Sequence, residues 1–146
     1  LALARAEFAA GKEREARARV AAVWRNEDMT LWLESQMLKE FGDWLTEADH
    51  KTRALRFAYP GKAAATRAAA KAGETVGALI KARMAVVADE ASDKLMAAVT
   101  PALQKDPLYL LSQAQKLRRA GDLGAALKVM AEAPKVHFSA LMTNPC

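Results

Sequence analysis

Cysteine is almost absent from this chain, because Cys146, the last of its 146 residues, is the only one. A single thiol can form no disulfide within the chain and leaves no cysteine-based metal site. Long apolar runs are also missing, since no stretch approaches the roughly 18 apolar residues that span a bilayer. We therefore expect no membrane-spanning segment.

Glycine and proline are scarce as well, with 7 and 5 residues, whereas alanine occurs 34 times. Alanine has the highest intrinsic helix propensity and lets neighbouring helices approach closely. No stretch shows the sustained apolar-polar alternation of a strand, while helical spacing of apolar residues runs through almost the whole chain. The sequence therefore predicts an all-α protein.

Turn and cap residues divide the chain into about nine short helices. Thr46 followed by Asp49 is a variant of the capping box, and Asp106 followed by Pro107 is an equally clear helix start. We expect helices at residues 1–10, 12–25, 31–41, 47–59, 62–73, 76–88 and 107–120. A further helix should begin at the cap Ser92, with a kink or a break at Thr100-Pro101, and the last should run from the cap Asp122 to Pro134.

Three predicted hairpins share a loose pattern, in which an alanine lies seven residues before the glycine that ends the first helix. The pairs are Ala4 and Gly11, Ala54 and Gly61, and Ala114 and Gly121. Glycine supplies the positive φ of a helix end, and the small alanine permits a close crossing. This predicts an irregular α-solenoid, or superhelix, of stacked antiparallel hairpins, each covering the apolar face of its neighbour.

The two ends of the chain are unlike those of a natural domain. It begins Leu-Ala-Leu-Ala, with neither an initiator methionine nor the layout of a secretion signal, and ends Met-Thr-Asn-Pro-Cys. We therefore expect residues 1–146 to form a single α-superhelical segment of a longer protein.

Glu34, followed by Ser35, is the first candidate for catalysis, as a general acid. Such a glutamate needs a hydrophobic pocket that raises its pKa. Glu34 instead falls within a predicted amphipathic helix, with no glycine-rich or substrate-lining segment after it. We therefore expect a solvated helix residue.

His50 and His137 are the only histidines. A metal site on a helix needs further ligands at helical spacing, and position 54 is an alanine. We expect His50 to bond locally or to pack between helices. The sequence assigns no catalytic residue, no metal site and no cofactor to this chain.

Other side chains that can carry chemistry lack the context for it. No nucleophile elbow surrounds the serines, no base accompanies the C-terminal thiol, and the glycines form no phosphate-binding fingerprint. These residues are Ser35, Ser92, Ser112, Ser139, Cys146, Gly73 and Gly77.

Aromatic and basic residues are the remaining candidates. Trp24, Trp32 and Trp44 would suit a sugar-stacking platform, but we expect them to anchor the corners between helices. The net charge of +5 is spread too widely for a typical nucleic-acid binder, and we expect no nucleic-acid partner. Two basic groups, expected to be solvated surface, are Lys116, Arg118 and Arg119, and Arg14, Arg17 and Arg25.

Two segments resemble the helical portion of the soluble lytic murein transglycosylases. They are "FGDWLTEADHKTRALRFAYPGKAAATRAA", residues 41–69, and "DPLYLLSQAQKLRRAGDLGAALKVMAEAP", residues 106–134. The first contains the stretch from Phe41 to His50. The anchors of the second are Asp106-Pro107, Leu117-Arg118-Arg119 and Ala133-Pro134.

This resemblance implies the α-superhelical arm of a periplasmic enzyme, a carbon-oxygen lyase. The family cleaves peptidoglycan between N-acetylmuramic acid and N-acetylglucosamine and leaves a 1,6-anhydro end. A glutamate in a separate lysozyme-like domain does this chemistry, in a Glu-Ser setting followed by Gly-Leu-Met-Gln. That motif does not occur here, so Glu34 does not inherit the role and the catalytic domain is missing.

The sequence therefore predicts a non-catalytic scaffold that guides peptidoglycan glycan strands to the catalytic domain of a parent lytic transglycosylase in the periplasm. The alternative is a stand-alone helical-repeat module that binds a protein or a peptide. A basic nucleic-acid binder, recognised by a steep salt dependence, ranks third.

Overall fold

The computed structural model describes residues 1–134, and these form an all-α fold, which confirms the predicted fold class. Helices account for 75% of the described residues, and no strand occurs among them. The α-helices of this part are α1 (Ala2–Ala9), α2 (Glu13–Asn26), α3 (Leu31–Phe41), α4 (Glu47–Ala58), α5 (Ala63–Ala69), α6 (Glu74–Val87), α7 (Asp93–Ala97), α8 (Pro107–Arg119) and α9 (Leu123–Glu132). Two 3-10 helices are η1 (Gly42–Trp44) and η2 (Leu103–Lys105).

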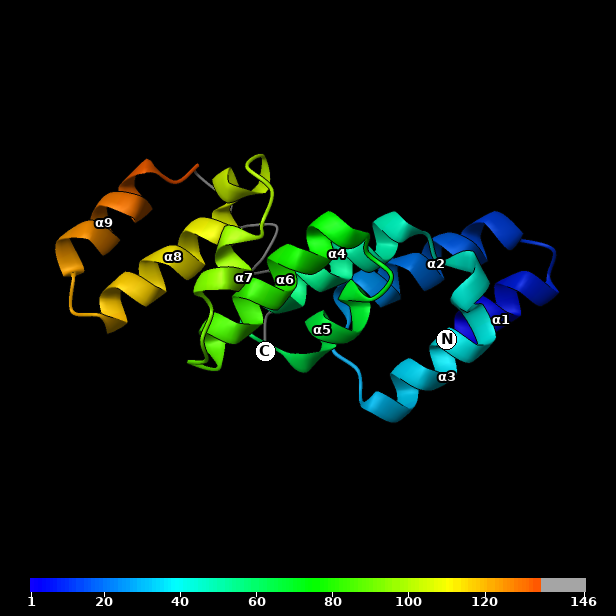
Figure 1. Ribbon diagram of the computed structural model, residues 1–146. Helices are drawn as coiled ribbons and strands as arrows, with labels where there is room; N and C mark the ends of the chain where they lie inside the picture. The colour runs from blue at the N-terminus through cyan, green and yellow to red at the C-terminus, as the bar shows by residue number, and fades with distance from the viewer. Residues whose placement is uncertain (135–146) are drawn as a thin grey trace.

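The helices follow one another along an elongated molecule, with α1, α2 and α3 at one end and α9 at the other (Figure 1). Helices α2, α4, α6 and α8 form a row in which each packs against the next. Helices α1, α5 and α9 pack against α2, α4 and α8, to which short turns join them. The superhelical course of an α-solenoid stays a prediction.

The alanine and glycine pairs lie where the spacing predicts. Gly11, Gly61 and Gly121 have φ values of 77°, 74° and 84°, and the alanine seven residues before each of them is buried. At Gly61 an added Cβ would lie only 2.6 Å from Cγ1 of Val87. This turn therefore needs glycine both for its backbone and for its contact with the end of α6.

Two helices differ from their predicted bounds. Helix α5 ends at Ala69, and Gly73, with a φ of 85°, is the N-cap of α6 rather than the end of α5. The segment after Ser92 is divided rather than kinked, which is one of the two outcomes predicted at Thr100-Pro101, but α7 already ends at Ala97 and only the short η2 follows. Pro101 has no N–H and disfavours helical backbone at the residue before it. Ser92 is buried, and its side chain makes no capping bond.

The core is divided into two clusters of buried side chains. One lies among α1, α2 and α3 and includes Val20, Trp24, Met37 and Phe41. The other extends from α4 to α8 and includes Phe57, Leu79, Ile80, Val86, Val99 and Leu108. Charged side chains connect the two clusters at the place where α2 and α3 meet α4 and α5.

Candidate functional site

Glu34 is buried, so the prediction of a solvated helix residue is wrong. Only 2% of its surface is exposed. It shares one face of α3 with Met37 and Phe41, three and seven residues further on, and this spacing puts it on the buried stripe of the helix. The helix begins after Thr30, whose side chain accepts a hydrogen bond from the backbone N–H of Leu33.

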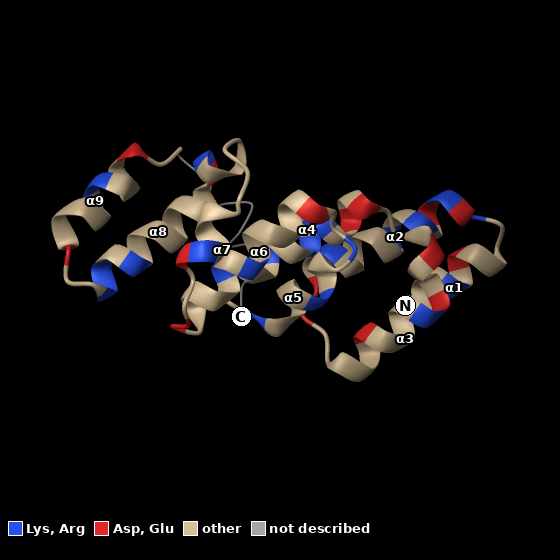
Figure 2. Ribbon diagram, in the orientation of Figure 1, with Lys and Arg blue, Asp and Glu red and all other residues tan. Residues whose placement is uncertain are grey.

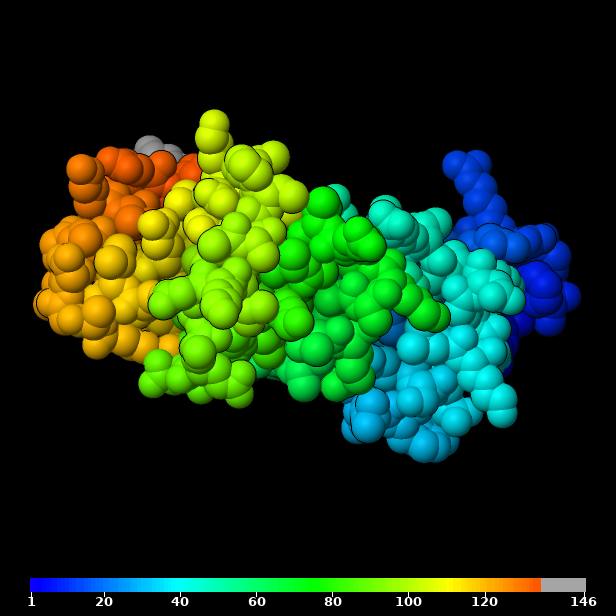
Figure 3. All heavy atoms as spheres, viewed as in Figure 1, coloured from blue at the N-terminus to red at the C-terminus, as the bar shows by residue number. Residues whose placement is uncertain are grey.

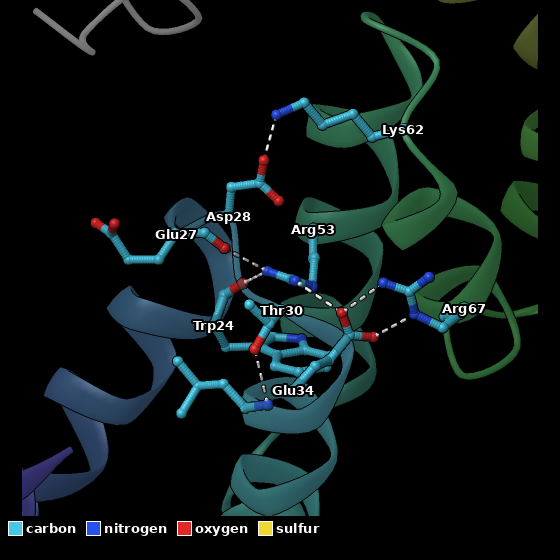
Figure 4. Close-up of polar contacts among 9 residues, drawn as sticks. Trp24, Glu27, Asp28, Thr30, Glu34, Arg53, Lys62 and Arg67 are labelled. Atoms are coloured by element: carbon cyan, nitrogen blue, oxygen red, sulfur yellow. Dashed lines mark hydrogen bonds and ion pairs between the residues drawn. The ribbon is translucent and has the colours of Figure 1, made fainter. Parts of the chain in front are cut away.

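Two arginines hold the Glu34 carboxylate (Figure 4). Arg67 of α5 donates one hydrogen bond of 2.9 Å to each carboxylate oxygen, and Arg53 of α4 donates from Nη2 at 3.2 Å. The Arg53 side chain is fully buried, whereas 38% of the Arg67 side chain is exposed. The cluster therefore joins α3, α4 and α5 and reaches solvent at Arg67.

These ion pairs keep Glu34 ionised. Burial alone would raise the pKa of Glu34, but the hydrogen bonds from Arg67 and Arg53 outweigh burial and hold the pKa below its ordinary value. A glutamate that acts as a general acid near neutral pH needs the opposite shift. The carboxylate therefore anchors two guanidinium groups, and the geometry does not suit it to donate a proton.

Replacing Glu34 by glutamine is expected to weaken the acid sensitivity of folding. A carboxylate whose pKa is lowered in the folded state stabilises the fold above its ordinary pKa of about 4.3, and this stabilisation is lost as the pH falls toward the lower folded value. The wild type should therefore lose stability more steeply than E34Q from about pH 5 downward. Urea unfolding followed by circular dichroism between pH 7 and pH 3 measures the two slopes.

The matched control for this experiment is Glu15→Gln, because Glu15 is an exposed glutamate of α2. That variant should keep the slope of the wild type. If E34Q and E15Q show the same pH dependence, the ion pairs of Glu34 do not contribute to the acid sensitivity.

Arg53 is the residue around which this cluster is built. Its Nη1 donates to the backbone carbonyls of Trp24 and Glu27, at 2.7 and 2.9 Å, where α2 ends. Its guanidinium carbon lies 4.5 Å from the ring centroid of Trp24 and 4.7 Å from that of Phe57, within the range of cation–π attraction. Within the described residues its Nε has no hydrogen-bond partner.

The same kind of contact recurs along the row of helices. Arg83 of α6 donates to the carbonyls of Ala58 and Tyr59, at the end of α4, at 3.1 and 2.9 Å. Arg119 of α8 donates to the last two carbonyls of α6. The final carbonyls of a helix lack partners within the helix and carry partial negative charge, so a cation there is favourable. We call Arg53, Arg83 and Arg119 the arginine ladder.

The sequence analysis missed Arg53 and Arg83, and it missed the backbone contacts of Arg119. Arg53 lies three residues after the buried His50, and Arg83 three residues after the buried Ile80, so both arginines share the buried stripe of their helices. An arginine on the buried stripe of a helix was the sequence signal that could have identified both residues as buried. Arg119 is exposed, as expected, but it also donates to the carbonyls at the end of α6, because the row brings that end beside α8.

His50 packs between helices, as predicted. Its ring lies edge-on to Trp24, with 5.3 Å between centroids and 77° between planes. Burial is the main cause that lowers the pKa of His50; Lys71 and Arg53 act in the same direction and Asp49 opposes them. A buried, neutral imidazole packed on an indole is a core residue here.

Several basic residues pair with carboxylates rather than forming a free basic surface. Arg25 of α2 donates to Asp49, and Asp49 also closes the predicted capping box with Thr46, in which both hydrogen bonds are present. The other members of the two basic groups are paired, as Arg17 with Glu13 and Lys116 with Asp93, or exposed, as Arg14 and Arg118. Acidic residues lie among the lysines and arginines over most of the ribbon, although the end of α8 carries basic residues alone (Figure 2). This distribution gives no support to a nucleic-acid interface.

Two of the three tryptophans anchor helices, as predicted. Trp24 is buried, and Trp44 lies 5.3 Å from the ring of Phe8 and 5.0 Å from that of Phe41. For Trp32 the prediction is wrong, because 71% of this residue is exposed. It lies in the first turn of α3, on the side opposite the buried stripe.

The described serines occupy structural or exposed positions. Ser112 is buried and donates to the carbonyl of Leu108 in its own helix, and Ser35 is exposed. Within residues 1–134, no three His, Cys, Asp or Glu side chains come together to hold a metal ion. Three further candidates, His137, Ser139 and Cys146, lie outside the described residues.

Four grooves lie on the surface of residues 1–134, and Glu34 lines none of these four. The largest of them, of about 620 Å³, lies along α5 and α6. Another, of about 380 Å³, lies between α8 and α9, and we call it the α8–α9 groove. Its lining residues are Leu111, Ala114, Gln115, Arg118, Leu123, Ala126, Leu127 and Met130.

No protein-family model, no curated protein and no solved structure matches this chain. Among the helices of residues 1–134, none combines the length and the apolar character needed to cross a bilayer. Interpretation of the site therefore depends on its own geometry, which is that of buried ion pairs and arginine contacts holding helices together.

Proposed function

We propose that this chain is a non-catalytic helical scaffold of a periplasmic peptidoglycan lytic transglycosylase. The observation that carries the proposal is that both segments resembling the family's helical arm are helical hairpins of one row. Residues 41–69 include α4 and α5, and residues 106–134 include α8 and α9. Residues of these segments stabilise the helices and their packing, since Asp49 closes a capping box and Arg119 belongs to the arginine ladder.

The state of Glu34 supports a scaffold rather than a catalyst. One glutamate does the chemistry in the family that the two segments resemble, and a glutamate that acts as a general acid needs a raised pKa. Glu34 is buried against Arg53 and Arg67, and its pKa is lowered. In the proposed protein the chemistry belongs to a separate catalytic domain.

The arginine ladder supports the mechanical part of the proposal. Each ladder arginine fastens one helix of the row to the end of the preceding one, from α2 through α8. A row fastened in this way makes a stiff frame. Its moderate positive charge tolerates the anionic, peptide-bearing glycan that such a frame would guide.

Purified murein sacculi provide the test. We expect the chain to co-sediment with sacculi, less so as the salt concentration rises, and to release no anhydro-muropeptides. The E34Q variant should behave like the wild type in both respects. Release of anhydro-muropeptides by the wild type but not by E34Q would overturn the non-catalytic assignment.

A pull-down from a periplasmic extract, added to the sacculus experiment, separates the alternative function, a stand-alone module that binds a protein or a peptide. A chain that ignores sacculi but retains one stoichiometric protein from a periplasmic extract would favour that alternative. Co-sedimentation without such a partner would favour the scaffold.

A further inference from the structure

The ends of α4, α6 and α8 share one backbone geometry. Each helix is closed by a residue with a positive φ, which is Gly61, Asp89 or Gly121, with values of 74°, 59° and 84°. The N–H of that residue donates to the carbonyl three residues before it, and the following N–H donates to the carbonyl five residues before its own position. This is the Schellman motif of a helix C-terminus. The three helix ends therefore present equivalent carbonyls to a neighbour.

At two of these ends, the carbonyls three and two residues before the positive-φ residue bind an arginine of the ladder. At the end of α4 these carbonyls belong to Ala58 and Tyr59, and they accept hydrogen bonds from Arg83. At the end of α6 they are the last two carbonyls of the helix, and they accept from Arg119. Each arginine comes from the next helix of the row. The position is therefore a recurring contact between successive helices.

At the end of α8 the same position is open. Its two carbonyls belong to Arg118 and Arg119, and no arginine side chain of residues 1–134 donates to them. Both residues are exposed, whereas Ala58, at the matching position of α4, is buried. Helices α8 and α9 form one end of the molecule, and no later helix of the described part lies beyond them (Figures 1 and 3).

The α8–α9 groove adjoins this open position, since Arg118 belongs to its lining. The wall is mostly aliphatic, and Leu127, with 72% of its surface exposed, lies on it. Helix α9 has one buried residue, Ala126, whereas the shorter α5 has three buried alanines. An apolar helix surface that stays so open is typical of a site that binds another element.

The α4–α5 hairpin shows how such a groove is filled. Helix α6 packs against both α4 and α5, and Ile80 of α6 belongs to the same buried cluster as Ala58 of α4. At Gly73, the N-cap of α6, an added Cβ would lie 3.1 Å from Oε1 of Glu47, the first residue of α4. Arg83, in the second half of α6, reaches the end of α4. The two helices therefore run in the same direction, and one contact combines an apolar stripe with an arginine.

We propose that the α8–α9 groove binds one further amphipathic helix of the same protein, from a segment that follows residue 146. The inference rests on the proposed function, because it requires this chain to be part of a longer frame. The added helix lies along α8 as α6 lies along α4. Its apolar side chains cover the aliphatic wall, and its arginine donates to the carbonyls of Arg118 and Arg119.

Two observations determine this choice of occupant. Residues 135–146 contain no arginine, and the arginines of residues 1–134 do not reach the open carbonyls, so the donor comes from outside this chain. Within the row, the helix that supplies each arginine comes later in the sequence than the helix that it binds, as for α4 on α2, α6 on α4 and α8 on α6. A later segment of the same protein continues that order.

Hydrogen exchange of the natural longer protein and of the 146-residue chain tests the proposal. The amides of α9 should exchange about tenfold or more slowly in the longer protein, because a covered helix opens less often. Leu127→Glu should remove this protection in the longer protein and leave the exchange of the 146-residue chain nearly unchanged. The matched control is Lys128→Glu, because Lys128 is exposed on the same helix but does not line the groove. This variant should keep the protection.

The arginine is tested separately. Cross-linking from Lys128 in the longer protein identifies the segment that covers the groove, and replacing the arginine of that segment by methionine should speed the exchange of α9 about tenfold, as expected for the loss of hydrogen bonds from a charged donor. Replacing an exposed lysine of the same segment by methionine should have no such effect. A covering segment without an arginine would contradict the proposed contact.

Other results overturn the proposal as a whole. Equal exchange of α9 in the two proteins, or a natural protein that consists of residues 1–146 alone, excludes a further covering helix. Slow exchange in the 146-residue chain that is lost when the chain ends at Pro134 assigns the groove to residues 135–146. Slow exchange that increases with protein concentration assigns it to a second copy.

The sacculus experiment keeps this inference distinct from the proposed function. A longer protein that protects α9 but ignores sacculi would refute the proposed function and leave the covering helix in place. A longer protein that binds sacculi while α9 exchanges as in the 146-residue chain would refute the covering helix alone.

Discussion

Replacing Arg53 by methionine is expected to lower the free energy of unfolding by about 3–5 kcal/mol, the usual effect of removing one partner of a buried ion pair. The substitution keeps the volume of the side chain but removes three hydrogen-bond contacts, to Glu34 and to the carbonyls of Trp24 and Glu27. The carbonyl of Trp24 and the carboxylate of Glu34 are then buried without that donor. Urea unfolding at pH 7 measures the loss.

Two companion variants show whether the cause is the buried charge. Lys51→Met removes an exposed cation of the same helix and should change stability by no more than about 0.5 kcal/mol. The double variant R53M/E34L removes both buried charges and should recover part of the loss, because a carboxylate left with Arg67 as its one ion-pair partner is no longer buried. If R53M is as stable as K51M, Arg53 does not hold α2 against α4.

Replacing Gly61 by alanine is expected to lower the free energy of unfolding by about 2–5 kcal/mol. The positive φ of 74° contributes about 1–2 kcal/mol of this loss for a residue with a Cβ. The new Cβ would lie 2.6 Å from Cγ1 of Val87, and such overpacking adds about 1–3 kcal/mol. Val87 cannot rotate away easily, since a valine in a helix has one strongly preferred rotamer.

Gly11 provides the control for the contact with Val87. Its φ of 77° is nearly the same, but an added Cβ there meets no atom within 4 Å. Gly11→Ala should therefore show the backbone effect alone, about 1–2 kcal/mol. Thermal and urea unfolding of the two variants should differ accordingly. Equal losses would mean that the approach of Val87 to the turn does not matter for stability.

Local signals in the sequence account well for the helices. The start of α4 at Thr46 and Asp49 and the start of α8 at Asp106 follow from side chains that bond to backbone groups two or three residues away. The positive φ of Gly61 likewise depends on the conformational freedom of one residue. Such interactions are complete within one or two turns of chain, so they can be recognised without knowledge of the fold.

Tertiary packing alone settled which polar side chains are buried and what they bind. Glu34 meets Arg53 and Arg67, which lie 19 and 33 residues away, and Arg83 binds the end of a helix 24 and 25 residues earlier. A helical stripe shows that a residue faces inward, but the partner is chosen by how neighbouring helices cross. The same packing leaves Trp32 in solvent while it buries Trp24, although both lie on amphipathic helices. Local sequence patterns do not contain the distances between residues that are far apart in the chain. A carboxylate held by arginines can therefore be told from a solvated one only in the folded structure.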